Sequence, residues 1–218
     1  MNLFITQNSY YFVHRHFIQL FDNEKSKVIY VNERGRGLVK KYIEILQNFG
    51  CINTLICSLL EVLYFLKLFK RQSRLDSLKI DDINLNLFLE DEIETGKYNQ
   101  IISIGCPCMI NSSLQDKFNI RIINLHGGII PYQKGRFSPL KSINKGHEFL
   151  GASLYLISDS FDEGVILSQD YFQLTNTNTI TNYNKVLKLS ANLLDLLFQN
   201  KTKTVPSEVL INLSKGNI

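Results

Sequence analysis

The feature that most constrains this 218-residue chain is the stretch 121–131, RIINLHGGIIP, where an apolar strand runs directly into a polar loop. The apolar run is typical of a strand buried in a parallel sheet, and the Gly-Gly pair and the proline end it. Asn124 and His126 lie two positions apart, so on an extended backbone both side chains point to the same face. The sequence therefore places an amide beside an imidazole at the carboxyl end of a strand, where open α/β sheets bind ligands.

This pair of side chains suits acyl transfer. The Asn124 amide can stabilise an oxyanion, and a neutral His126 can take a proton from an attacking amine. Either residue alone has an ordinary structural explanation, but together before a Gly-Gly loop they indicate a site. A carboxylate beside His126 would raise its basicity and set its tautomer. Asp162 in a later loop is our candidate, and the spacing leaves Asp159 and Glu163 open as alternatives.

The order of apolar runs and turns predicts an α/β fold, a Rossmann-like and mostly parallel sheet flanked by helices, with an antiparallel strand pair late in the chain. Strands are expected at 2–6 and 27–31, after a charged connector over 73–83, and at 98–104, 120–125, 149–157 and 165–172. Helices are expected at 9–21, 38–49, 58–70, 88–95, 112–118, 138–145 and 182–199. We predict one catalytic domain over 1–200, followed by a polar C-terminal tail over 201–218.

Charge and hydropathy limit the partners. The net charge is +4 and the pI is about 8.8, which fits anionic small molecules, and no basic block predicts a nucleic-acid partner. The most apolar segment, 55–69, is short for a bilayer span and carries Glu61 and Lys67. We therefore predict no stable membrane span and favour a buried helix or the face of a homodimer; a helix in the membrane interface is a weaker alternative.

The four cysteines do not form a metal motif. Cys106-Pro107-Cys108 is a C-x-C and not the C-x₂-C of a zinc knuckle, and no histidine cluster supplies further ligands. The first residues lack the basic and apolar regions of a secretory signal. We expect free thiols, no metal and a cytoplasmic location.

Residues 124–136, NLHGGIIPYQKGR, resemble the signature of the 10-formyltetrahydrofolate-dependent formyltransferases. That signature has Asn-x-His, small residues, two aliphatic residues and a proline, and then a glycine. Residues 151–155, GASLY, resemble a later strand of the family, and 162–169, DEGVILSQ, resemble its aspartate loop and the next strand. The resemblance, which covers about 98–172, implies the family's fold and metal-free chemistry. It also implies that Asn124, His126 and Asp162 are catalytic.

The resemblance further implies that 10-formyltetrahydrofolate is the co-substrate. In the family, folate lies against the loop after the preceding strand, which here runs from 105 to 110. Backbone groups of this loop and of the Asp162 loop would bind the pterin-like ring, and apolar side chains would flank it. Cys106 and Pro107 depart from the bulkier residues usual there. The implied folate-binding residues are Gly105, Cys106, Pro107, Cys108, Met109 and Ile110.

Members of the family act on glycinamide ribonucleotide, on methionyl-tRNA and on nucleotide-linked amino sugars. The chain leaves no room for the usual C-terminal tRNA-binding domain, and no basic patch replaces it. The chain looks most like the sugar N-formyltransferases, because a helical insertion at 55–70 and Gly127-Gly128 differ from what we expect in the purine enzyme. The residues placed to hold a sugar and its diphosphate are Gly128, Tyr132, Lys134 and Arg136.

We therefore predict an N-formyltransferase that moves the formyl group of 10-formyltetrahydrofolate to a nucleotide-linked amino sugar, in lipopolysaccharide or another glycan pathway. One alternative is the phosphoribosylglycinamide formyltransferase of purine synthesis. A second enzymatic alternative is hydrolysis of the formyl group by water. An alternative of another class is a non-catalytic folate- or nucleotide-binding relative.

Overall fold

A computed structural model describes residues 1–7, 15–21, 26–32, 38–68, 78–175 and 178–215. The chain divides into two compact units, Met1–Ile123 and Asn124–Ile218. The hydrogen-bonded strands follow the order β3-β2-β1-β4-β5-β6-β7, mostly parallel with an antiparallel pair late in the chain, so the predicted fold class is confirmed. The single domain predicted over 1–200 stays a prediction.

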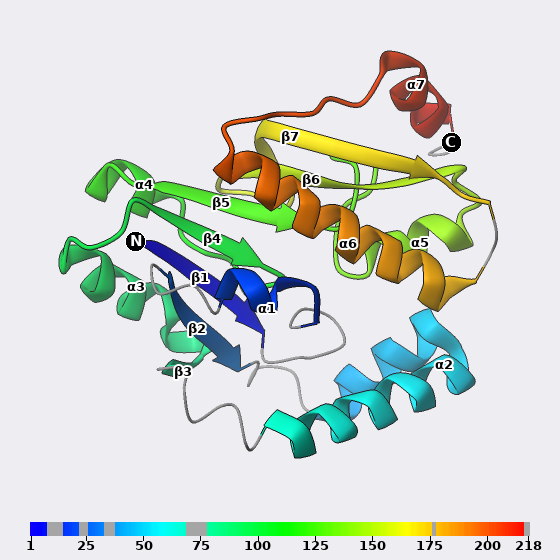
Figure 1. Ribbon diagram of the computed structural model, residues 1–218, viewed down its shortest axis with the longest axis horizontal. Helices are drawn as coiled ribbons and strands as arrows, with labels where there is room; N and C mark the ends of the chain where they lie inside the picture. Colours follow the sequence, from blue (N-terminus) through cyan, green and yellow to red (C-terminus); the bar gives the residue numbers. More distant parts are fainter. Residues whose placement is uncertain (8–14, 22–25, 33–37, 69–77, 176–177, 216–218) are drawn as a thin grey trace. The chain divides into compact units, whose positions relative to one another are not determined.

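The described residues of unit 1 form four parallel strands in the order β3-β2-β1-β4 (Figure 1). Their middle residues are buried, as expected for parallel strands covered on both faces. The strands are β1 Asn2–Gln7, β2 Ser26–Asn32, β3 Leu78–Asp81 and β4 Gln100–Ile104. The helical elements are α1 Arg15–Phe21, α2 Leu38–Leu68, the 3₁₀ turn η3 Asp82–Asn84, α3 Leu85–Glu94 and α4 Ser113–Phe118. Residues 8–14, where the first helix was expected to begin, lie outside the described residues.

Aromatic and aliphatic side chains attach the helices of unit 1 to its strands. Phe21 of α1 packs edge-on against Phe4 of β1, with 5.2 Å between ring centroids, and stacks on Phe17. Helix α3 buries one face at a spacing of four residues, as an amphipathic helix does. The buried residues of α3 are Leu85, Leu89 and Ile93.

Helix α2 differs from the sequence prediction. It continues from 38 to 68 and is interrupted only at Gly50, whose φ of 75° and ψ of 166° are not helical. The predicted stop at this glycine is therefore confirmed, but the second helix begins directly after it and not at Ser58. Residues 51–57 contain no Gly or Pro that would delay it. A side chain also spans the break, because Asn53 Nδ2 donates to the Phe49 carbonyl at 2.9 Å.

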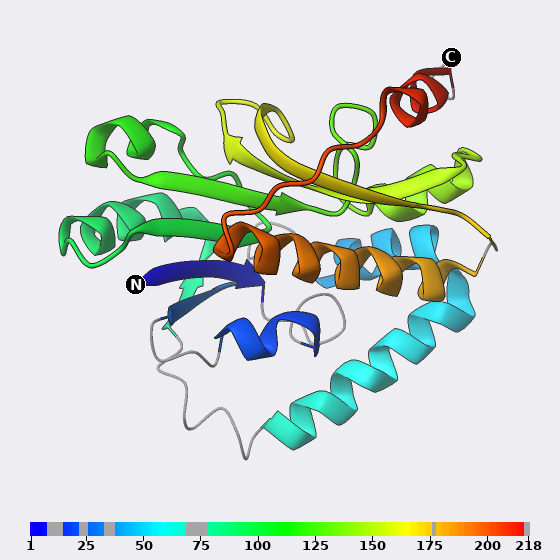
Figure 2. The same ribbon diagram turned by 45° about the horizontal axis from the view of Figure 1, so that its top comes forward.

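Unit 2 is built on the antiparallel pair β6 and β7, which the sequence predicted. Phe149 pairs with Gln173 at one end of the ladder and Ile157 with Gly164 at the other. Helix α6 packs along these strands (Figures 1 and 2). The elements are the end of β5 Arg121–His126, α5 Ser138–Asn144, β6 Phe149–Ile157, β7 Gly164–Gln173, α6 Thr179–Phe198 and α7 Ser207–Lys215.

The two faces of β6 have different neighbours. A Cβ built on Gly151 would touch Ile129, and the Ser153 hydroxyl bonds to the loop after β5, so the odd positions of β6 face this loop. The even positions point to the opposite face, because strand side chains alternate. Leu150, Ala152 and Leu154 occupy these even positions and are fully buried. One strand thus separates an apolar layer from a polar one.

The segment after residue 200 is not the polar tail that the sequence predicts. Its backbone runs beside β7, where the Lys203 carbonyl accepts from Gln169 N at 2.9 Å and Lys203 N donates to Ser168 Oγ at 2.8 Å. Helix α7 follows. Residues four apart share one helical face, and here that face packs on the loop after β5. The buried cluster consists of Ile129, Val205, Val209 and Leu213.

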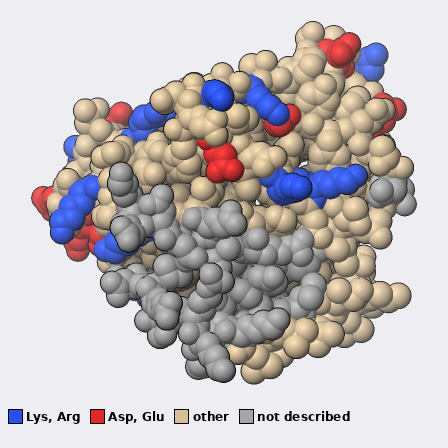
Figure 3. All heavy atoms as spheres, in the orientation of Figure 1, with Lys and Arg blue, Asp and Glu red and all other residues tan. Residues whose placement is uncertain are grey.

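The described residues show neither a membrane-spanning helix nor, on the face in Figure 3, a patch of one charge. No helix among the described residues combines the length and apolar character required to cross a bilayer. On the described part of the face in Figure 3, basic and acidic side chains are interspersed and do not gather into a block of one sign.

We predict that α7 contributes to the stability of unit 2. Leu213→Ala removes a side chain that is 1% exposed and should lower the free energy of unfolding by about 2–5 kcal/mol. Ile211→Ala, at a position that is 55% exposed on the same helix, is the control and should change it by less than about 0.5 kcal/mol. Urea denaturation measures both. Equal, small losses would mean that α7 is not packed in solution.

Candidate active site

The loop that follows β5 is held by buried polar side chains. Ser153 Oγ donates to the Gly128 carbonyl at 2.6 Å and accepts from Ile130 N at 3.1 Å. Gln169 Nε2 donates both to the Ile130 carbonyl at 2.9 Å and to Ser153 Oγ at 2.8 Å. A buried loop is stable only when its backbone groups find partners, and here β6 and β7 supply them.

Gln133 closes the same loop from the other side and is 2% exposed. Its Oε1 accepts from Ile129 N at 3.1 Å and its Nε2 donates to the Phe149 carbonyl at 2.7 Å. Its own backbone carbonyl then lies 2.6 Å from His126 Nε2. Gln133 therefore fixes both the path of the loop and one side of the imidazole.

His126 lies between two acceptors. Its Nδ1 is 3.3 Å from Asp162 Oδ1, and both side chains are about one tenth exposed. Because a carbonyl can only accept, the Nε2 atom that faces Gln133 carries a hydrogen. A second hydrogen on Nδ1 would make the ring a cation opposite the Asp162 carboxylate, and this geometry suits such an ion pair. The neutral base predicted from the sequence, with its hydrogen on Nε2 and its Nδ1 lone pair beside Asp162, stays a prediction.

Asp162 is held on both of its oxygens. Oδ1 accepts from Tyr155 Oη at 3.1 Å and Oδ2 accepts from Gly135 N at 2.5 Å. Its φ of 51° is left-handed, a conformation that Asp adopts more readily than most residues. Of the two neighbouring carboxylates that the sequence left open, Glu163 pairs with Lys134 at 2.7 Å and Asp159 is exposed. The structure thus brings Asp162 to the imidazole.

Asn124 joins this group through a residue that the sequence analysis missed. Its Nδ2 donates to Tyr155 Oη at 2.7 Å, and no described residue accepts the other amide hydrogen. Asn124 is half-buried, so this hydrogen can meet a ligand. Spacing could not identify Tyr155, because it lies 31 residues from Asn124 in the sequence.

A profile of the family described as "Formyl transferase" matches residues 87–195, half of the chain. The chain belongs to the formyl transferase family. The match contains Asn124, His126 and Asp162, and the predicted family is confirmed.

Two curated formyltransferases resemble the chain over part of its length. A dTDP-4-amino-4,6-dideoxyglucose formyltransferase of Mycobacterium bovis is 32% identical over 73 residues, which are 34% of this chain and 30% of that protein. A methionyl-tRNA formyltransferase of Finegoldia magna is 25% identical over 120 residues, 54% of this chain and 38% of that protein. The chain thus matches about a third of the length of these relatives.

A solved structure shares the fold. The phosphoribosylglycinamide formyltransferase of Campylobacter jejuni superposes with a TM-score of 0.59 and 14% identity, over 92% of this chain and 96% of that protein. At this identity the likeness shows the formyl transferase fold and not a substrate.

Gly128, predicted to bind the substrate, lies against the imidazole. A Cβ at this position would collide with the Gln133 carbonyl oxygen and would come within 2.8 Å of His126 Nε2 and 2.9 Å of Ser138 Oγ. The loop can approach the ring only because residue 128 has no side chain.

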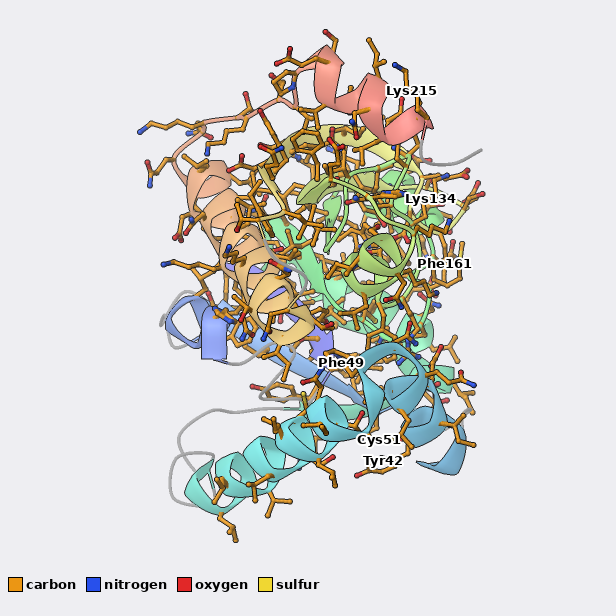
Figure 4. All side chains as sticks on the ribbon, turned by 90° about the vertical axis from the view of Figure 1, so that its right-hand side faces the viewer. Tyr42, Phe49, Cys51, Lys134, Phe161 and Lys215 are labelled. Atoms are coloured by element: carbon orange, nitrogen blue, oxygen red, sulfur yellow. The ribbon has the colours of Figure 1, made fainter. Side chains whose placement is uncertain are left out.

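The other predicted substrate residues lie in three different environments. Tyr132 packs against the cluster of Ile129 and α7. Lys134 is exposed beside the Asp162 loop, on the same side as Phe161 in Figure 4. The Arg136 guanidinium lies over the ring of Phe137 at 5.7 Å. Of the three, Lys134 is the most accessible to a charged ligand.

The predicted folate loop, Gly105 to Ile110, belongs to unit 1, and its contact with folate stays a prediction. Asn86 of α3, which the sequence analysis missed, holds it by donating to the Met109 carbonyl at 3.2 Å. Cys106 Sγ lies 3.8 Å from Cys108 Sγ, and this contact, with burial, raises the pKa of the Cys106 thiol well above its usual value. The Cys106 thiol therefore keeps its hydrogen at neutral pH. Within the described ranges, no group of three or more His, Cys, Asp and Glu is placed to hold a metal.

We predict that Gly128→Ala disturbs the imidazole. The added methyl group must displace His126 or the Gln133 carbonyl, and such overpacking should cost about 1–3 kcal/mol of stability. The His126 ring resonances should shift in NMR spectra. Gly127→Ala is the control, because its Cβ would contact side-chain carbons of Val186 and Pro139, at 3.3 and 3.6 Å, and not the imidazole or the Gln133 carbonyl. Identical spectra and stability for the two variants would contradict the packing described here.

Proposed function

We propose that the chain is a folate-dependent N-formyltransferase that transfers a formyl group from 10-formyltetrahydrofolate to the amine of a nucleotide-linked amino sugar. The observation that carries the proposal is the 3.3 Å contact between His126 and Asp162, with Asn124 joined to the same carboxylate through Tyr155. In a member of the formyl transferase family, this arrangement provides an oxyanion donor beside a group that can hold a proton.

The reaction needs little from the protein beyond positioning and charge. The folate supplies a formyl group on a nitrogen that can leave as an amine. The free amide hydrogen of Asn124 donates to the formyl oxygen as negative charge develops there; such a donor is typically worth about 10²–10³ in rate. The pair His126 and Asp162 holds the proton that the attacking amine loses and returns it to the leaving nitrogen. One C–N bond forms and one breaks, without oxidation or reduction.

The amino-sugar acceptor is favoured over the purine acceptor by two observations. The relative with 32% identity is named for an amino-sugar nucleotide substrate. Lys134 is exposed on the loop beside Asp162 and can meet a diphosphate. We place the reaction in glycan synthesis, such as that of lipopolysaccharide, in the cytoplasm. The acceptor of purine synthesis, phosphoribosylglycinamide, stays the second candidate.

One assay separates the remaining possibilities. The protein is mixed with 10-formyltetrahydrofolate and a panel of amino-sugar nucleotides and phosphoribosylglycinamide, and released tetrahydrofolate is followed by absorbance. Turnover with one amino-sugar nucleotide supports the proposal. Turnover with phosphoribosylglycinamide alone supports the purine function. Formate release without any amine would show hydrolysis, and tight folate binding without turnover would show a binding protein.

We predict that Asp162→Asn and His126→Ala each lower the rate of formyl transfer by about 10²–10⁴, because each breaks the pair that moves the proton. The fold should persist, as circular dichroism would show. Asp159→Asn, in the same loop but exposed, is the control and should retain the wild-type rate. Near-normal turnover in both site variants would refute the catalytic assignment.

We also propose a homodimer formed through α2, with no nucleic-acid partner and no stable membrane span. The helix exposes apolar side chains that recur every seven residues, the pattern of helices that pack lengthwise on one another. Between Lys41 and Lys67 the sequence has no Lys or Arg, whereas a helix in the membrane interface depends on a basic face. Figure 4 shows α2 with its side chains. The exposed residues are Ile52, Leu55, Ile56, Leu59, Val62, Leu63 and Leu66.

We predict that the wild-type chain sediments as a dimer and that Leu59→Glu shifts it to the monomer, because the charge lies in the middle of the apolar face. Leu87→Glu in α3 is a matched control, since Leu87 is 69% exposed and Leu59 is 60% exposed. Analytical ultracentrifugation measures both variants. A wild-type monomer at micromolar concentration would contradict the proposed dimer.

A further inference from the structure

Tyr155 contacts two predicted catalytic residues at once. It lies in β6, is 4% exposed, and its hydroxyl is 2.7 Å from Asn124 Nδ2 and 3.1 Å from Asp162 Oδ1. Asn124 comes from the end of β5 and Asp162 from the loop between β6 and β7. The hydroxyl is therefore the point at which side chains from three segments meet.

The hydrogens in this group have one consistent arrangement. An ionised carboxylate only accepts, so the single hydroxyl hydrogen of Tyr155 is donated to Asp162. The hydroxyl oxygen must then accept from Asn124, and only Nδ2 of the amide can donate. Asp162 thus sets the orientation of the Asn124 amide through Tyr155. The second hydrogen on Nδ2 is held in the amide plane, where a ligand can accept it.

This order persists at ordinary pH. Burial and, next, the negative charge of Asp162 raise the pKa of the Tyr155 hydroxyl. The hydroxyl therefore keeps its hydrogen even in mildly alkaline solution and continues to donate to the carboxylate.

We infer that Tyr155 is a positioning residue, which holds the Asn124 amide with an N–H, and not its oxygen, directed at the formyl oxygen. The inference rests on the proposed function, and it adds how the oxyanion donor is oriented. The NH₂ group and the oxygen of the amide are nearly equal in size. Without the Tyr155 hydroxyl, the amide can therefore rotate by half a turn and exchange their positions. The amide oxygen would then face the developing negative charge and repel it.

The test is Tyr155→Phe, which keeps the ring and removes the hydroxyl. We expect kcat to fall about tenfold, less than the 10²–10³ for loss of the donor itself, with little change in KM for either substrate. Tyr171→Phe in β7 is the matched control, because the Tyr171 ring packs edge-on against Phe149 outside this group. Equal kcat values for the two variants would overturn the inference and leave the proposed function intact.

A double variant distinguishes positioning from a general loss of structure. In the Asn124→Ala background, Tyr155→Phe should have much less effect on kcat than it has alone, because the residue through which it acts is gone. An undiminished effect in that background would overturn the inference.

NMR spectroscopy tests the positioning role of Tyr155 without turnover, and so separates it from the proposed formyl transfer. The side-chain NH₂ resonances of Asn124 should shift in NMR spectra of Tyr155→Phe and stay in place in Tyr171→Phe. Unchanged resonances in both variants would overturn the inference. If the wild-type chain transfers no formyl group to any acceptor, the proposed function fails, whereas shifted resonances would still support the link between Tyr155 and Asn124.

Discussion

The hydrogen bond between His126 and the backbone carbonyl of Gln133 determines the state of the whole candidate site. A carbonyl can only accept, so the 2.6 Å contact fixes a hydrogen on Nε2 and turns Nδ1 toward Asp162. The contact exists only because the loop after β5 folds back on the ring, which in turn requires a residue without a side chain at Gly128. The path of the loop, the position of the hydrogen on Nε2 and the contact between Nδ1 and Asp162 therefore depend on one another.

The antiparallel strands make such a buried loop stable. An unsatisfied buried backbone group costs about 1–3 kcal/mol, and Ser153 and Gln169 together satisfy several of them. Both residues are buried, and Ser153 shares its face of β6 with Tyr155, which reaches Asn124 and Asp162. The same strand face thus supports the loop and holds Asn124 and Asp162, so the late strand pair of the fold is also the support of the candidate site.

Part of the fold and of the candidate site could be predicted from the local sequence pattern. The period of two in a strand placed Asn124 and His126 together, and the glycines and alternating apolar runs predicted most of the elements. The partners of these residues could not be read from spacing, because Gln133 acts through its backbone and Tyr155 is 31 residues from Asn124. Helix α7 was missed because it buries only Val209 and Leu213, with Val205 just before it, in a mostly polar segment. Its four-residue spacing was visible, but its partner Ile129 is distant in sequence.

The segment that contains Lys203 has a further effect on the behaviour of the chain. Strand β7 is last in the sheet order, and an open strand edge is a template on which other chains can add β-structure. Lys203 bonds to this edge through its backbone and pairs with Asp170 at 2.6 Å through its ammonium group. A chain shortened to end at α6 would expose that edge. Such a chain would be expected to self-associate along this edge.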